Sequence, residues 1–345
     1  MSWDNEYTAV CDVIDRSEGT TKEKRYLKRD IKKTFKRYGR IDYRVFPIEF
    51  RWNLCAARMR LGKYDNYDGW EYRSNWSITF QGWNGYTNPL PKWTGQPVER
   101  LLVLGEQGIG DEILFASCLP ELIVRLGHKP IVFHTYPRLI PLMERSFRIE
   151  CLPRKDLSEY VDGDAVVALG DLMMFYRRHS SHFPRKPYLK PDPVRVEYWK
   201  QRLSKLGDKP KIGIAWKARH GVLNPHDLMV EDAIYINLQY LKHPDGLWEE
   251  SLPEGIVDLG VDPLTDLEEQ FNLVAALDRV VTVTQTVSHV CGSLGKQCDV
   301  VRPPKGSGEV TNSLFYYGTG GPMVPYGTVH VHNSLNEYLC RLTTK

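Results

Sequence analysis

The sequence predicts an α/β protein in which two doubly wound parallel-sheet domains follow a basic, mostly helical N-terminal region. Short apolar runs alternate with helical periodicity between residues 97 and 342, as expected of strands that alternate with covering helices. The alternation restarts after a proline-rich connection at residues 187–193. We therefore expect an N-terminal region over residues 1–96, a first α/β domain over 97–192 and a second over 193–345, with a cleft between the two domains.

The N-terminal region is predicted to contain a strongly basic helix. A capping-box pattern precedes apolar residues at three-to-four-residue spacing, namely Leu27, Ile31, Phe35 and Tyr38. Residues 22–63 hold 15 Lys or Arg against 4 Asp or Glu, although the net charge of the whole chain is only +3. This surface is either a solvated basic face or a contact site for a polyanion.

The two α/β domains are predicted element by element. The run Leu-Leu-Val-Leu at residues 101–104 is apolar on both faces, as expected of a buried parallel strand, and a Gly-rich loop follows it. Strands are predicted at 100–104, 130–134, 165–169, 211–216, 255–259, 279–283 and 300–303. Helices are predicted at 113–126, 138–145, 196–206, 267–277, 286–294 and 333–342.

The composition argues against several classes of protein. The seven cysteines are scattered, odd in number and without a C-x-x-C pair, which argues against a disulfide framework or a zinc site. No stretch approaches the roughly 20 apolar residues that span a bilayer, and no apolar leader follows the first residues. We therefore expect a cytoplasmic protein without a membrane span.

The loop between the first predicted strand and helix is the first candidate site. Residues 105–112 read G-E-Q-G-I-G-D-E, which is not the dinucleotide-binding pattern G-x-G-x-x-G. Asp111 and Glu112 stand where a phosphate would meet the helix N-terminus, so a phosphate is disfavoured there. Asp111 is either a helix cap or a general base that takes a proton from a hydroxyl group.

Two further loops carry groups that suit a diphosphate. The strand-to-helix loop at 281–289 has no acidic residue and offers hydroxyl and backbone N–H groups at a helix N-terminus, with an ordinary capped helix as the alternative. Lys217 and Arg219 follow a predicted strand and either neutralise a departing diphosphate or remain solvated. A D-x-D metal-binding pattern occurs at Asp162-Gly-Asp164, but its place just before a strand favours a turn.

Several blocks of this sequence resemble the glycosyltransferase portion of the bacterial and phage-type tetratricopeptide-repeat glycosyltransferases, which are related to the lipopolysaccharide heptosyltransferases. The matching blocks follow in the family's order at 61–73, 91–95, 105–116, 187–189, 212–216 and 277–295. The resemblance implies the GT-B fold, in which two Rossmann-like domains face a cleft and the C-terminal one binds the donor. In place of a repeat array, only one repeat-like unit, at residues 50–73, precedes them.

The same resemblance implies an inverting glycosyltransferase that uses a nucleotide-sugar donor and needs neither a metal nor a cofactor. Asp111 corresponds to the carboxylate that activates the acceptor. The implied donor-binding residues are Lys217, Arg219, Gln239, Thr284, Gln285, Thr286, Val287, Ser288 and His289. The implied acceptor-side loop contains Gln107, Gly108, Gly110 and Glu112.

One departure from the family pattern keeps alternatives open. Gln285 stands where the family usually has an aspartate, so a charge near the nucleotide is missing. The chain is therefore either an active transferase or a catalytically inactive binding protein with the same fold. The acceptor is a glycan, a protein or DNA; in the last case the basic region 22–63 would guide the enzyme to hydroxylated bases.

Overall fold

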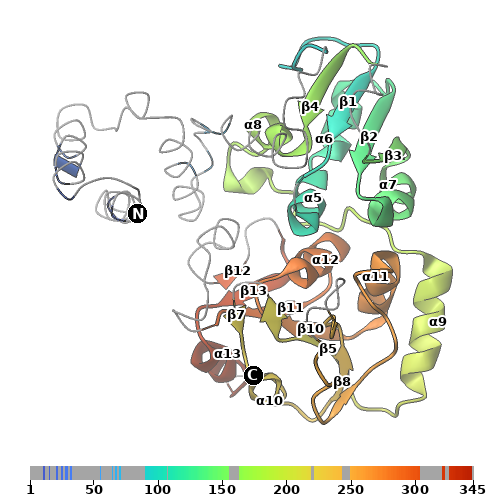
Figure 1. Ribbon diagram of the computed structural model, residues 1–345, viewed down its shortest axis with the longest axis vertical. Coiled ribbons are helices and arrows are strands. Elements are labelled where there is room, and N and C mark those ends of the chain that lie inside the picture. Colours follow the sequence, from blue (N-terminus) through green and yellow to red (C-terminus); the bar gives the residue numbers. More distant parts are fainter. Residues whose placement is uncertain are drawn as a thin grey trace.

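The computed structural model describes residues 90–106, 108–154, 163–218, 221–242, 249–303, 321–322 and 326–343. Before residue 90 it describes isolated positions, namely Cys11, Asp15, Thr21, Arg25, Lys28, Arg29, Lys32, Cys55, Tyr64, Tyr67 and Trp70. The described part contains two separate, largely parallel sheets, each accompanied by its own helices (Figure 1). The predicted α/β class with parallel sheets is confirmed.

The first sheet has the strand order β3-β2-β1-β4, and all of its strands are parallel. Its strands are β1 (Leu101–Leu104), β2 (Ile131–Thr135), β3 (Glu150–Pro153) and β4 (Ala165–Ala168). Its helices are α5 (Ile109–Ala116), α6 (Leu119–Arg125), α7 (Ile140–Phe147) and α8 (Leu172–Tyr176), with 3₁₀ turns η3 (Pro137–Leu139), η5 (Leu169–Asp171) and η6 (Ser180–His182). Because β1 is central, the loop that follows it lies in the middle of the sheet's carboxyl edge.

The second sheet has the order β12-β13-β11-β10-β5-β8-β9, in which β12 is antiparallel to β13 and the other pairs are parallel. Its strands are β5 (Lys211–Ala215), β8 (Ile234–Asn237), β9 (Ile256–Val257), β10 (Arg279–Thr282), β11 (Cys298–Val301), β12 (Gly321–Pro322) and β13 (Val329–His332), and a ribbon is formed by β6 (Lys217–Ala218) and β7 (Gly221–Val222). Its helices are α9 (Pro193–Ser204), α10 (Pro225–Leu228), α11 (Leu267–Ala276), α12 (Thr286–Leu294) and α13 (Leu335–Thr343). The loops after β5 and β10 are neighbours at its carboxyl edge.

Aromatic residues that precede the first sheet pack into its core. Trp70 is fully buried, and its ring lies edge-on to the ring of Phe115 on α5 with 6.2 Å between the centroids. Tyr67 donates its hydroxyl group to the carbonyl of Arg177 at 2.5 Å. These side chains are therefore part of the same hydrophobic core as α5.

Two local differences from the predicted elements have physical reasons. The helix predicted at 113–126 is divided into α5 and α6, because Pro120 has no N–H group and its ring would clash with the carbonyl of Ala116 in a continuous helix. The strands β3, β8 and β13 were not predicted. Each has four residues and includes polar ones, so none forms the longer apolar run that marks a buried strand.

The described part of the N-terminal region includes helical positions within the predicted basic helix. Arg25, Lys28, Arg29 and Lys32 are helical, and the Lys28 ammonium pairs with the Asp15 carboxylate at 2.6 Å. The rest of the predicted basic helix lies outside the described residues. Of the helices that the structure describes, none has the length and the apolar composition needed to cross a membrane.

Candidate active site

The N-terminal turns of α5 and α12 meet between the two sheets (Figure 1). The helix α5 follows β1 and α12 follows β10, so each begins at the carboxyl edge of its own sheet. The two helices approach closely at Gly110, where a Cβ atom would lie 3.0 Å from Cδ2 of His289 and 3.6 Å from Oγ1 of Thr286. Glycine permits this approach because it has no side chain. The contact brings together the first two loops that the sequence indicated.

Asp111 lies in the first turn of α5 and is half-buried. The residue that caps this helix is Gly108, in an extended conformation (φ −104°, ψ 138°), so Asp111 does not occupy the N-cap position. A carboxylate in the first turn of a helix is stabilised in its charged form by the helix dipole. Asp111 thus presents a carboxylate, the type of group that serves as a general base, beside the start of α12. Gln107, another residue of the predicted acceptor-side loop, lies outside the described residues.

Glu112 is in a different environment from Asp111, although the two are adjacent. It is fully buried, and its carboxylate accepts hydrogen bonds from the backbone N–H of Glu106 at 2.8 Å and from the Thr135 hydroxyl. It also forms an ion pair with Arg154. Burial raises the pKa of Glu112, and the Arg154 guanidinium opposes that rise. Glu112 thus joins the loop after β1 to the ends of β2 and β3, and its carboxylate does not face solvent.

The residues at the start of α12 differ in how far they are exposed to solvent. Thr284, Gln285 and Thr286 are half-buried, whereas Val287 and Ser288 are fully covered. The N-cap residue Gln285 donates its side-chain amide to Oγ1 of Thr282 at 3.1 Å. Its backbone carbonyl accepts a hydrogen bond from the Ser288 hydroxyl at 2.6 Å. Ser288 therefore stabilises the first turn. The outward groups are those that a ligand at this helix N-terminus would meet.

Lys217 and Gln239 lie near the same carboxyl edge: Lys217 begins β6 shortly after β5 ends, and Gln239 follows the end of β8. Lys217 comes two residues after Ala215, which is in register with Thr282 at the end of β10. The Lys217 backbone N–H donates to Oε1 of the buried Gln239 at 3.1 Å. The Lys217 ammonium forms an ion pair with Glu250. Any anion that binds Lys217 competes with this carboxylate. Arg219 lies outside the described residues.

His289 connects the two α/β units through the side chains of Tyr326 and Tyr188. It is 6% exposed, and its Nδ1 lies 3.1 Å from the Tyr326 hydroxyl. That hydroxyl lies 3.4 Å from the hydroxyl of Tyr188, which donates to the Ile113 carbonyl of α5 at 2.8 Å. Burial lowers the pKa of His289 to about 4, so it is neutral at pH 7. Tyr188 belongs to a block that carried the family resemblance, whereas nothing in the sequence pointed to Tyr326.

The acidic pattern before β4 has a structural role at its second aspartate. The Asp164 carboxylate accepts the backbone N–H groups of Glu99 and Arg100 at 2.6 and 2.9 Å, which joins the segment before β4 to the segment before β1. Asp162 lies outside the described residues. Within the part of the chain that the structure describes, no cluster of three or more His, Cys, Asp or Glu side chains is arranged to hold a metal ion.

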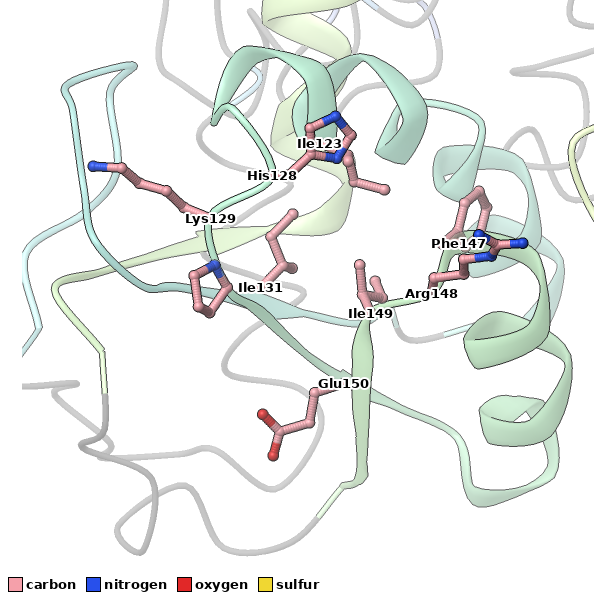
Figure 2. Close-up of a pocket in the computed structure, with 9 residues that line it drawn as sticks. Ile123, His128, Lys129, Ile131, Phe147, Arg148, Ile149 and Glu150 are labelled. Carbon is pink, nitrogen blue, oxygen red and sulfur yellow. The ribbon is translucent and has the colours of Figure 1, made fainter.

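A separate hollow of about 410 Å³ lies at the opposite edge of the first sheet (Figure 2). Its lining includes Ile131 and Glu150, the first residues of β2 and β3, together with Phe147 and Arg148 at the end of α7. The amino ends of parallel strands lie at the edge opposite to their carboxyl ends. The hollow is therefore remote from Asp111 and is not part of the candidate active site.

Comparison with known proteins gives one relative in sequence. No protein-family model matches the chain. Protein FlbA of Caulobacter vibrioides is 30% identical over 266 residues, which are 66% of this chain and 44% of FlbA. The chain thus spans less than half the length of this curated relative.

Three of the solved structures that match part of this chain are named as glycosyltransferases. The E. coli ADP-heptose lipopolysaccharide heptosyltransferase II has a TM-score of 0.46 and 13% identity over 71% of this chain and 98% of that chain. A glycosyl transferase family 9 protein from Veillonella parvula has a TM-score of 0.47 and 12% identity over 72% and 92% of the respective chains. E. coli heptosyltransferase WaaC with ADP has a TM-score of 0.38 and 11% identity over 62% and 95%.

Proposed function

We propose that this chain is a glycosyltransferase of the GT-B type, which moves a sugar from a nucleotide-sugar donor to a hydroxyl acceptor. The observation that carries the proposal is the close approach of Gly110 to Thr286 and His289, because Asp111 directly follows Gly110. One helix start thus presents a carboxylate, and the facing one presents backbone N–H groups that favour an anion. A base beside an anion site is what transfer from a diphosphate leaving group to a hydroxyl group requires.

In the proposed reaction, Asp111 accepts the proton of the acceptor hydroxyl while the hydroxyl oxygen forms a bond to the anomeric carbon of the donor. The bond between that carbon and the diphosphate oxygen breaks, and its electron pair leaves with the nucleoside diphosphate. Attack on the face opposite the leaving group inverts the anomeric centre. Asp111 afterwards releases the proton to water.

The leaving diphosphate is stabilised in this proposal by groups of the second α/β unit. Backbone N–H groups at the start of α12, the Thr286 hydroxyl and the Lys217 ammonium are the donors available for the developing charge. Lys217 must exchange Glu250 for the diphosphate when the donor binds. We propose that these groups replace a metal ion, so that activity should persist in EDTA.

The test is a screen of nucleoside diphosphate sugars for transfer or for slow donor hydrolysis, followed by comparison with Asp111→Asn. The variant should bind the donor within a few-fold of the wild-type protein but lose about a hundredfold or more in turnover. Asp232→Asn is the matched control, because Asp232 is a surface carboxylate paired with Lys209. Turnover of Asp111→Asn within about threefold of wild type would mean that Asp111 is not the general base. A strict metal requirement would overturn the metal-independent mechanism.

A further inference from the structure

The imidazole of His289 is held between two elements from different α/β units. Its Nδ1 lies 3.1 Å from the Tyr326 hydroxyl. On the other side, its Cδ2 and Nε2 would lie 3.0 and 3.6 Å from a Cβ atom on Gly110. The ring is 6% exposed. Any shift of this ring must therefore move either Tyr326 or the first turn of α5, which carries Asp111.

Tyr326 is itself fixed in place by α12. A Cβ atom on Gly292 would lie 2.2 to 2.5 Å from three atoms of the Tyr326 ring, so the ring occupies the position of the missing side chain. The side chain is 2% exposed. Close packing of this kind leaves the ring little freedom to move. The Tyr326 hydroxyl is thereby held beside both His289 and Tyr188.

Tyr188 extends the contact to the last turn of α5. In a continuing helix the Ser117 N–H would bond to the carbonyl of Ile113, but it bonds to Leu114 at 3.2 Å instead. The Ile113 carbonyl accepts the Tyr188 hydroxyl at 2.8 Å. The backbone N–H of Tyr188 donates to the Ser293 carbonyl of α12 at 3.0 Å. The segment that connects the two units is thus bound to both helices.

We propose that Tyr188 and Tyr326 are positioning residues, which act through His289 and Ile113 to hold α5 at a fixed distance and orientation from α12. This inference rests on the proposed function, because the groups held in register are Asp111 and the start of α12. Proton transfer and bond formation depend steeply on the separation of the reacting groups, and a misplacement of about 1 Å costs about a hundredfold in rate. The tyrosines themselves touch neither substrate in this proposal.

The experiment compares Tyr326→Phe, Tyr188→Phe and the double variant, each of which keeps the aromatic ring and removes only a hydroxyl group. Tyr338→Phe is the matched control: Tyr338 is fully buried in α13 and packs against His332, away from α5. Turnover, KM for the donor and the affinity for nucleoside diphosphate are measured for each protein. Amide hydrogen exchange of residues 108–117 is measured in parallel and needs no activity.

Both single variants should lose about tenfold or more in kcat, while KM and the nucleotide affinity stay within about twofold. Exchange at residues 108–117 should become faster in both and unchanged in Tyr338→Phe. The double variant should lose little more than either single one, because the two hydroxyl groups act in series. Unchanged exchange in α5, additive losses, or an equal loss of nucleotide affinity would each overturn the proposal. Absence of any transfer or hydrolysis by the wild-type protein would instead overturn the proposed function. The exchange measurement would still show whether the two tyrosine hydroxyl groups hold α5 in place.

Discussion

The ring of Tyr326 occupies the space in which a side chain on Gly292 would stand, with 2.2 Å between its Cγ and the position of a Cβ atom. Gly292→Ala should therefore lower the free energy of unfolding by about 1–3 kcal/mol through overpacking. Chemical denaturation measures this cost. In a Tyr326→Ala background the same methyl group has room, so the added cost should vanish. An equal cost in both backgrounds would mean that backbone shifts or other neighbours of Gly292, rather than Tyr326, respond to the substitution.

Neutralising the adjacent carboxylates Asp111 and Glu112 should destabilise the protein to very different extents. Glu112→Gln leaves Arg154, which is 13% exposed at its side chain, without its buried charge partner. We expect it to lower the free energy of unfolding by about 3 kcal/mol. Asp111→Asn should cost about 1 kcal/mol or less, the size of a helix-dipole contribution. Thermal and urea unfolding of the two variants check this ordering, and the reverse ordering would contradict the environments described for the pair.

The ion pair between Lys217 and Glu250 should weaken the binding of nucleoside diphosphate. Both side chains are about one-third exposed, at 32% and 36%, so the competition is modest. Glu250→Gln should tighten nucleotide binding by about two- to fivefold, and Lys217→Met should weaken it by about 1.5–3 kcal/mol. Calorimetry gives both values. The control is Glu249→Gln, next in sequence and 3.9 Å from Lys242. Unchanged nucleotide affinity in Lys217→Met would mean that the diphosphate does not bind at Lys217.

Stability should fall on mild acidification because two histidines are buried in the neutral state. Burial lowers the pKa of both His134 and His289 to about 4, whereas an unfolded chain has histidine pKa values near 6.5. Between these values the unfolded state binds more protons than the folded state, so the free energy of unfolding decreases as the pH falls from about 6.5 to 4. Each histidine accounts for about 3 kcal/mol at most. The pH dependence of urea unfolding should be shallower in His134→Gln and His289→Gln, and curves parallel to wild type would contradict these pKa shifts.

The loops of the candidate site could be predicted because their order along the chain determines where they lie. A parallel strand followed by a helix brings the connecting loop to the carboxyl edge of its sheet, so residues 105–112 and 284–289 were expected at such edges. Which of two adjacent carboxylates faces inward could not be predicted. The Glu112 side chain points inward because Thr135, the last residue of β2, and Arg154, which directly follows β3, supply its partners.

The contacts between the two units could not be predicted either. Tyr326 follows His289 by 37 positions and Tyr188 by 138. Local periodicity describes how one element meets its own sheet, but it carries no information on how two sheets are oriented. Glu250 was missed for a similar reason, since it lies 33 positions from Lys217 on a loop without a recognisable pattern.

The packing of Trp70 against Phe115 bears on how small a working fragment of this chain can be. A fragment that starts at β1 would contain both sheets and every residue of the candidate site. It would nevertheless lack the indole that covers α5 and the phenol that binds the Arg177 carbonyl. Removing a fully buried tryptophan costs about 3–5 kcal/mol, a large part of the stability of an ordinary domain. We therefore expect expression fragments and domain exchanges to remain soluble only when their boundary lies upstream of Tyr67.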